Sequence, residues 1–153
     1  MKRSTRKHTN PDLGVLAGQV LFSVQKELFT TLAQQGHPDL RPQHGAVLAY
    51  LDEQGTRATD LATMSGQHKQ VIGTLIDELE TLGYVTRQPD PTDRRAKLIV
   101  PTERGLDEMT RSDAIVAAIE QRHAQTLGQD TYDAFKHAFQ HIARNQRAWN
   151  KTP

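Results

Sequence analysis

Side chains that could contact nucleic acid gather in two short stretches of this 153-residue sequence. The first begins at His68 and continues with Lys69 and Gln70, with Thr74 one helical turn later. The second lies around Arg95 and is rich in arginine. Lysine and glutamine can reach base edges in the major groove, whereas arginine enters narrow minor grooves and forks onto phosphate. These residue types indicate recognition of duplex DNA if the intervening elements bring both stretches to one surface.

Two short helices joined by a tight turn would hold the first stretch. We expect one helix to open at Thr59, whose hydroxyl can accept from free N–H groups, and to break at Ser65-Gly66-Gln67, where glycine permits a left-handed conformation. A second helix should run from about His68 to Leu82 and end at Gly83. Two helices joined in this way are typical of a helix-turn-helix unit.

The two faces of the second helix differ in polarity. Apolar residues at three- and four-residue spacing predict a core-facing stripe of Val71, Ile72, Leu75, Ile76, Leu79 and Leu82. The opposite face has no acid in its first turns, which favours approach of phosphate to the beginning of the helix. Gly73 on that face either lets the backbone come close to a partner or is merely tolerated. The candidate DNA-binding residues here are His68, Lys69, Gln70, Gly73 and Thr74.

A two-stranded ribbon should follow, with strands at 84–88 and 96–100. Pro89 and Pro91 fix φ at two positions between the strands, so we expect 89–95 to be a stiffened loop that extends neither strand. Basic residues in and beside the loop outweigh its two aspartates. They are further candidates for contact with phosphate or the minor groove: Arg87, Arg94, Arg95 and Lys97.

These stretches also carry a family resemblance. The motifs are Leu61-Ala62, Gly66, Leu75, Leu79 and Gly83-Tyr84-Val85, then Asp90-Pro91-Thr92-Asp93-Arg94-Arg95-Ala96-Lys97 and Thr102-Glu103-Arg104-Gly105. Together they resemble the winged helix-turn-helix of the MarR family of bacterial transcriptional regulators. The resemblance implies that the second helix enters the major groove and that Arg95 enters the minor groove. It also implies that Asp93 orients the wing by pairing with a neighbouring basic group.

Long amphipathic helices should flank this unit. Apolar patterning predicts one helix at about 11–36, a shorter one from Pro42 towards Gly55, and two more across about 103–148 with a break near Gly128. The resemblance implies that the terminal helices intertwine across a two-fold axis. We therefore expect one MarR-like domain at 11–153, with a winged helix-turn-helix lobe at about 40–105 and dimerisation helices at about 11–36 and 103–148. Residues 1–10 should be a basic, flexible tail that adds phosphate contacts or only solubilises the chain.

Composition argues against several other classes of protein. The sequence has no cysteine, so neither a disulfide framework nor a thiol switch is available. The net charge of +1 is small, so the distribution of charge is more informative than its total. The apolar fraction of 36% fits a dimer in which two copies bury apolar surface against each other. No apolar run is long enough to span a membrane and no secretory signal is recognisable, which predicts a cytoplasmic protein.

The sequence offers few candidates for an enzyme, metal or ligand site. No phosphate-binding glycine loop, nucleophile elbow or zinc-protease motif occurs, so we predict no enzymatic activity and no cofactor. His137 and His141 share one helix face, but no nearby thiolate or carboxylate completes a site, and we predict no bound metal. The family resemblance implies a small-molecule cleft between the dimer-forming helices and the DNA-binding lobe. The candidate lining residues are Phe22, Ser23, Lys26, His44 and Tyr50.

The expected fold is mainly α with a small β-wing, a winged helix-turn-helix flanked by N- and C-terminal dimerisation helices. The predicted function is that of a homodimeric, sequence-specific DNA-binding repressor on a pseudo-palindromic operator, with a small-molecule effector as a further candidate partner. Two alternatives stay open: a winged-helix module that contacts proteins or dimerises without binding DNA, and a metal-responsive regulator. The arginine-rich wing favours DNA, because such side chains suit phosphate better than a protein surface.

Overall fold

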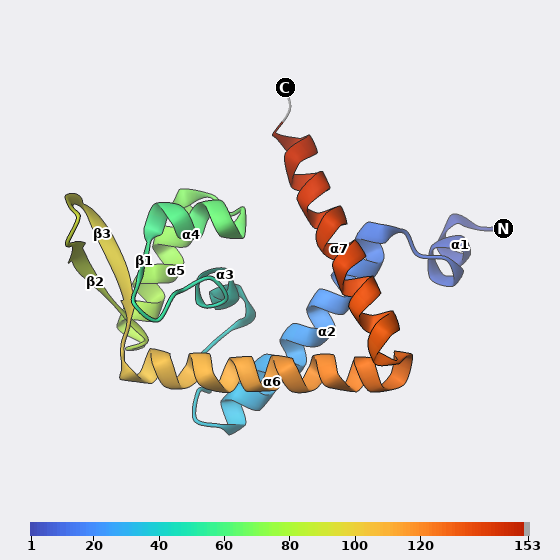
Figure 1. The fold of residues 1–153 in the computed structure, drawn as a ribbon, viewed down its shortest axis with the longest axis horizontal. Helices are drawn as coiled ribbons and strands as arrows, with labels where there is room; N and C mark the ends of the chain where they lie inside the picture. Colours follow the sequence, from blue (N-terminus) through green and yellow to red (C-terminus); the bar gives the residue numbers. More distant parts are fainter. Residues whose placement is uncertain (152–153) are drawn as a thin grey trace. The chain divides into compact units, whose positions relative to one another are not determined.

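Eight helical segments and three strands make up residues 1–151, the part of the chain that the computed structural model describes (Figure 1). The helical segments are α1 (Arg3–Thr9), α2 (Leu13–Gln34), η1 (Pro42–His44), α3 (Gly45–Leu48), α4 (Ala58–Ser65), α5 (Lys69–Thr81), α6 (Glu103–Leu127) and α7 (Gln129–Asn150); the strands are β1 (Thr56–Arg57), β2 (Val85–Asp90) and β3 (Asp93–Pro101). The expected fold class, mainly α with a small β-wing, is confirmed. The chain divides into two compact units, Met1–Asp113 and a second that begins at Ala114 within α6.

Both α4 and α5 are followed by a glycine in a left-handed backbone conformation. Gly66 ends α4 with φ 72° and Gly83 follows α5 with φ 86°, so both predicted left-handed positions are confirmed. The expected opening of the first helix at Thr59 is wrong, because α4 begins at Ala58 and the extended backbone of Arg57 occupies the capping position. Strand β1 therefore leads directly into α4 without a separate capping residue.

The core of the first compact unit is formed by the inward faces of α4, α5 and the sheet, together with residues of α2 and α3. Its most deeply buried residues are Leu32, Val47, Leu61, Ile72, Ile76, Leu79, Tyr84, Val85 and Ile99. Four of the six residues expected in the core-facing stripe of α5 are buried, namely Ile72, Leu75, Ile76 and Leu79. The prediction that Val71 is buried is wrong. Its side chain is 45% exposed and lies beside the polar face at the beginning of the helix.

The sheet is antiparallel with the order β1-β3-β2. Both strands of the wing extend further towards its tip than the sequence predicts: β2 continues through Pro89 to Asp90, and β3 begins at Asp93. The expectation that proline would keep 89–95 out of the strands is therefore wrong. Since β2 is an edge strand, proline there need not remove a ladder hydrogen bond.

The beginning of α6 is joined tightly to the turn between α5 and β2. The Thr102 side chain accepts from Gly105 N–H at 3.1 Å, as expected of a helix cap, and its hydroxyl donates to Gly83 O at 2.6 Å. The Thr102 N–H donates to Tyr84 O at 2.9 Å. A Cβ at Gly105 would lie 2.2 Å from that same carbonyl oxygen, so glycine is required for this approach.

Two N-terminal segments differ from expectation. Residues 1–10 were expected to be a flexible tail, yet Arg3–Thr9 forms α1, and Lys7 pairs with Asp12, which caps α2 by accepting from Val15 N–H. The helix expected from Pro42 to Gly55 is only η1 followed by α3 and ends at Leu48. A turn at Asp52 to Gly55 replaces the remainder and returns the chain to β1.

The second unit contains the end of α6 and all of α7, which the predicted break at Gly128, with φ 89°, separates. The Tyr132 hydroxyl donates to Glu120 Oε1 at 2.5 Å, and Lys136 Nζ lies 2.5 Å from the same oxygen. None of the residues of α7 is fully buried. Within residues 1–151, no helix has the length and apolar character needed to cross a membrane.

Glu108 is a buried acid on the first unit's part of α6. It is 2% exposed, Ser112 donates to Oε1, and Oε2 has no hydrogen-bond partner among the described residues. Burial, opposed by the Ser112 hydrogen bond and reinforced by Asp113 and Asp107, raises the pKa of Glu108 to about 7. Folding therefore favours the protonated carboxyl.

This shift predicts a pH-dependent stability. The raised pKa of Glu108 means that stability is fully present below pH 4.5, the ordinary value, and is lost as pH rises towards 7. Glu108→Gln should remove that loss and stabilise the protein at pH 8 by about 3 kcal/mol relative to wild type, with little difference at pH 4.5. Thermal unfolding from pH 4.5 to 8 measures this, with the exposed Glu103→Gln as control. Equal pH profiles for wild type and Glu108→Gln would refute it.

Candidate nucleic-acid interface

The beginning of α5 presents its polar residues to solvent. His68 precedes the helix with extended backbone and supplies no side-chain cap, so the first N–H groups of α5 remain open to an anion. Lys69, Gln70 and Thr74 are exposed, and the Thr74 hydroxyl donates to Gln70 O at 3.0 Å. A Cβ at Gly73 would meet nothing within 4 Å, so this position offers open space beside the backbone. The predicted residues therefore share one accessible helix end.

The tip of the wing supplies a second cationic surface. Arg94, Arg95 and Lys97 are exposed along β3, and their side chains have no carboxylate partner among residues 1–151. Unpaired guanidinium groups on a projecting ribbon can bind phosphate or enter a minor groove. These three predicted residues retain the freedom that such contacts require.

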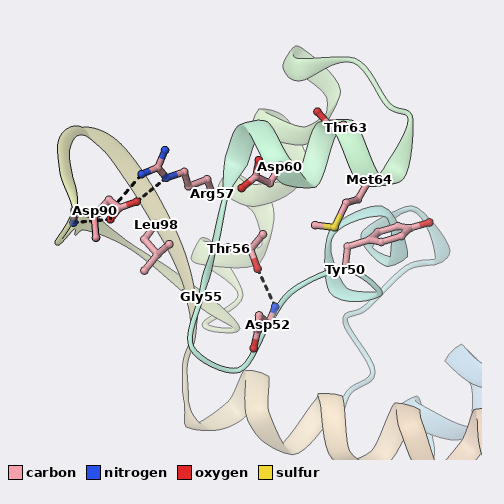
Figure 2. A pocket seen from close by; sticks show the side chains of 11 residues that line it. Tyr50, Asp52, Gly55, Thr56, Arg57, Asp60, Thr63, Met64, Asp90 and Leu98 are labelled. Carbon is pink, nitrogen blue, oxygen red and sulfur yellow. Dashed lines mark hydrogen bonds and ion pairs between the residues drawn. The ribbon is translucent and has the colours of Figure 1, made fainter. Parts of the chain in front are cut away.

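An ion pair that the sequence analysis missed fixes the wing to β1. Arg57 Nε donates to Asp90 Oδ2 at 2.6 Å, a contact that Figure 2 shows. Arg57 Nη2 donates to Thr92 Oγ1 at 3.3 Å, and all three residues line a hollow of about 570 Å³. The backbone N–H and hydroxyl of Thr92, followed by Arg57, lower the pKa of Asp90 to about 2. Asp90 is 6% exposed, and these hydrogen bonds keep its carboxylate ionised although burial alone favours the neutral form. The Asp-Pro-Thr spacing, typical of a side-chain-stabilised turn, was the available signal.

The role expected for Asp93 is corrected by this geometry. Asp93 Oδ1 accepts from the backbone N–H of Arg95 at 3.0 Å, and the ion pair with a basic residue belongs to Asp90. Asp93 acts on Arg57 only through its charge. It therefore shapes the local backbone next to Arg95, and Asp90 ties the wing to the rest of the lobe.

Arg87 also differs from its predicted role as a DNA contact. Its Nη2 lies 2.6 Å from Asp77 Oδ1 and its Nη1 lies 2.9 Å from Glu80 Oε1. Both carboxylates lie in the later turns of α5, so the guanidinium is engaged by that helix, whereas Arg94 and Arg95 have no carboxylate partner among the described residues.

Comparison with known proteins agrees with this arrangement. Residues 39–96 match the family model described as the MarR family. A transcriptional regulator of the MarR family from Rhodococcus sp. RHA1 is 30% identical, with 86% of this chain and 92% of that chain covered and a TM-score of 0.69. This chain belongs to the MarR family.

Two structures of a repressor are similar as well. CouR from Rhodococcus jostii RHA1, bound to p-coumaroyl-CoA, is 30% identical over 86% of this chain and 92% of that chain, with a TM-score of 0.71. CouR bound to a 23-mer DNA duplex is 27% identical over 90% of this chain and 96% of that chain, with a TM-score of 0.72. Comparison with curated proteins gives no match.

The residues expected to line one ligand cleft are found at several hollows in the described part of this MarR-family chain. Phe22 and Lys26 line a hollow of about 690 Å³ on α2, whereas Ser23 shares with Lys26 a smaller one of about 380 Å³. Tyr50 lines the hollow beside Arg57. Among these hollows, Phe22 and Lys26 share the mainly apolar one that Phe29 and Pro42 help to line.

His44 contributes to the fold instead of lining a hollow. It is fully buried, and its Nδ1 accepts from the Arg41 backbone N–H at 2.9 Å, so the ring proton lies on Nε2. Nε2 donates to Glu78 Oε2 at 2.8 Å, and Arg41 Nη2 donates to the same oxygen at 3.0 Å. The His44 hydrogen bond, ahead of the Arg41 charge, lowers the pKa of Glu78. This cluster joins η1 to α5.

The histidine pair on α7 is close but incomplete as a metal site. The rings of His137 and His141 lie edge-on with centroids 4.9 Å apart. No group of three or more histidine, aspartate or glutamate side chains arranged to hold a metal occurs within residues 1–151.

Arg95→Ala tests the wing. Because Arg95 is exposed and unpaired within the described residues, we expect its loss to weaken binding to duplex DNA of any sequence and to reduce the slope of log K against log salt by about 0.9, one phosphate's contribution. Fluorescence anisotropy over a salt series measures both quantities. Unchanged affinity in a correctly folded variant would remove the wing from the interface.

Proposed function

We propose that this MarR-family chain is a sequence-specific DNA-binding repressor that acts as a homodimer. The observation that carries the proposal is the pairing of an acid-free, uncapped beginning of α5 with an unpaired arginine tip on the wing, in one lobe. The helix end suits a major groove and the tip suits the flanking minor groove or phosphates. The similarity to CouR, solved on a DNA duplex, supports this function.

We assign DNA binding and dimerisation to different regions according to where apolar side chains remain exposed. We assign DNA reading to about 40–105 and dimerisation to helices at about 11–36 and 103–148. On α7, Phe135 and Phe139 stack with centroids 5.5 Å apart while 53% and 39% exposed, and Trp149 is 77% exposed. Large exposed apolar side chains mark a surface that another chain covers. A second copy, related by a two-fold axis, is the partner we propose.

We also propose that the protein is a regulator without enzymatic activity and that it acts in the cytoplasm. The similarity to a transcriptional repressor and to a transcriptional regulator of the MarR family supports this proposal. A protein-binding winged helix would have no use for the unpaired wing tip, and a metal-responsive regulator would need more ligands than the His137 and His141 pair.

Two copies related by a two-fold axis require a pseudo-palindromic operator with half-site centres roughly 10 bp apart, or a multiple of that spacing. Gln70 can hydrogen-bond an adenine edge, so Gln70→Ala should cost roughly 1–3 kcal/mol on the preferred site and leave non-specific binding nearly unchanged. Selection from random DNA, followed by footprinting and competition assays, tests both statements. An asymmetric site, or equal losses on selected and random DNA, would refute this assignment.

We further propose a small-molecule effector that binds the 690 Å³ hollow on α2. Phe22, Phe29 and Pro42 give it an apolar lining, and Lys26 is exposed and has no carboxylate partner among residues 1–151. An apolar wall with one free cation suits a ligand with an aromatic body and an anionic group. The CouR structure bound to p-coumaroyl-CoA supports an aromatic acid or its thioester as the class.

Release of DNA by p-coumaroyl-CoA or p-coumarate tests the effector. We expect one of them to dissociate the DNA complex, and Lys26→Ala to raise the concentration for half-release about tenfold, because one charge-assisted contact is lost. The affinity of each protein for DNA without ligand serves as the internal reference. Failure of both compounds to release DNA would exclude this ligand class and leave DNA binding itself untouched.

A further inference from the structure

Arg87 joins the wing to the recognition helix by three contacts. It lies in β2 opposite Ile99 of β3. Its guanidinium reaches Asp77 Oδ1 at 2.6 Å and Glu80 Oε1 at 2.9 Å, and its backbone N–H donates to Glu80 Oε2 at 3.3 Å. One side chain of the wing therefore bridges two successive turns of α5.

The charges at this junction do not favour phosphate. Arg87 is 30% exposed and lies between two carboxylates, so the three side chains together carry a net negative charge. Arg94 and Arg95 on the same ribbon are exposed and without carboxylate partners among the described residues. A guanidinium already engaged by two carboxylates would have to break those contacts to bind DNA.

The distal part of the wing has less support than its base. Thr56 and Arg57 of β1 pair with Ile99 and Leu98 of β3, so from Lys97 to the tip the ribbon has two strands. A two-stranded hairpin alone is only marginally stable in water. Besides the buried residues and backbone hydrogen bonds at the base, two side-chain ion pairs join the ribbon to the lobe: Arg57 with Asp90 near the tip, and Arg87 with the acids of α5, just before the two-stranded part begins.

We propose that Arg87 is a positioning residue: together with Asp77 and Glu80 it fixes the wing against the recognition helix, so that the wing tip and the beginning of α5 engage DNA at the same time. This inference rests on the proposed DNA-binding function. Fixing the two elements before binding removes an ordering cost from association, so the effect of Arg87 on affinity arises without contact with DNA.

A double-mutant cycle separates positioning from phosphate contact. The DNA is the site selected from random sequence, and the proteins are wild type, Arg87→Ala, Asp77→Asn/Glu80→Gln and the triple variant. Arg87→Ala should weaken binding about fivefold in wild type but less than about twofold when the acids are absent. Each effect of Arg87→Ala is measured between two proteins that have the same residues at positions 77 and 80. The general effect of removing two negative charges near DNA therefore cancels.

The salt dependence gives a second, independent reading of the same proteins. The slope of log K against log salt should be the same for wild type and Arg87→Ala, whereas Arg95→Ala should lower it by about 0.9. An Arg87→Ala slope lowered by about 0.9, with an undiminished loss of affinity in the background without acids, would assign Arg87 to phosphate and overturn the proposal.

Hydrogen exchange without DNA keeps the inference testable if the proposed function fails. The backbone amides of residues 85–90 and 93–101 should exchange faster in Arg87→Ala than in wild type, because the variant lacks the ion pairs that join the wing to α5. Arg94→Ala is the matched control, since it removes a guanidinium from the same ribbon without removing a carboxylate contact. Equal exchange in wild type and Arg87→Ala would overturn the proposal, whereas absence of DNA binding by wild type would overturn only the proposed function.

Discussion

The backbone carbonyl of Tyr84 is the point on which the geometry of the lobe depends. It accepts from Thr102 N–H and lies where any side chain at Gly105 would have to be. Four element ends consequently lie side by side at this carbonyl: the end of α5, the beginning of β2, the end of β3 and the beginning of α6. Arg104 reinforces the junction by donating to Leu82 O at 2.7 Å and lying 4.5 Å from the centre of the Tyr84 ring. The base of the wing is therefore fixed by backbone geometry, and only its distal part depends on side-chain pairs.

Arginine has two separate uses in this chain, and partner carboxylates decide which applies. Arg57 and Arg87 face Asp90 and the acids of α5, and they hold the wing in place. Arg94 and Arg95 face solvent. This separation explains how a protein of net charge +1 can present a strongly cationic edge: its acids neutralise the arginines that support the fold and leave those at the tip uncompensated. Raising the ionic strength should therefore weaken DNA binding through only a few contacts between these arginines and phosphates.

Local patterns predicted the elements, and long-range pairing explains what they missed. The left-handed glycines at 66 and 83 and the break at Gly128 depend on nearest neighbours, so the sequence was sufficient for them. Strand continuation through Pro89 depends on β2 being an edge, which is a property of the sheet. The pairing of Arg57 with Asp90 and the burial of His44 against Glu78 join residues over thirty positions apart, beyond any periodicity. Arg87 was assigned to DNA because its charge was visible in the sequence and its partners were not.

The acids that make the later turns of α5 unsuited to DNA also make them the helix's attachment points. Asp77 and Glu80 bind Arg87 of β2, and Glu78 binds Arg41 and His44 at η1. The recognition helix is thus held from two sides at the end that does not read bases. Pro42 lies between Arg41 and His44 and also lines the hollow on α2. A ligand that displaces Pro42 would act on Glu78 through the hydrogen bonds of η1, and any rotation of α5 that follows would carry the wing with it through Arg87. Effector binding and DNA reading would then be connected by contacts that lie within one compact unit.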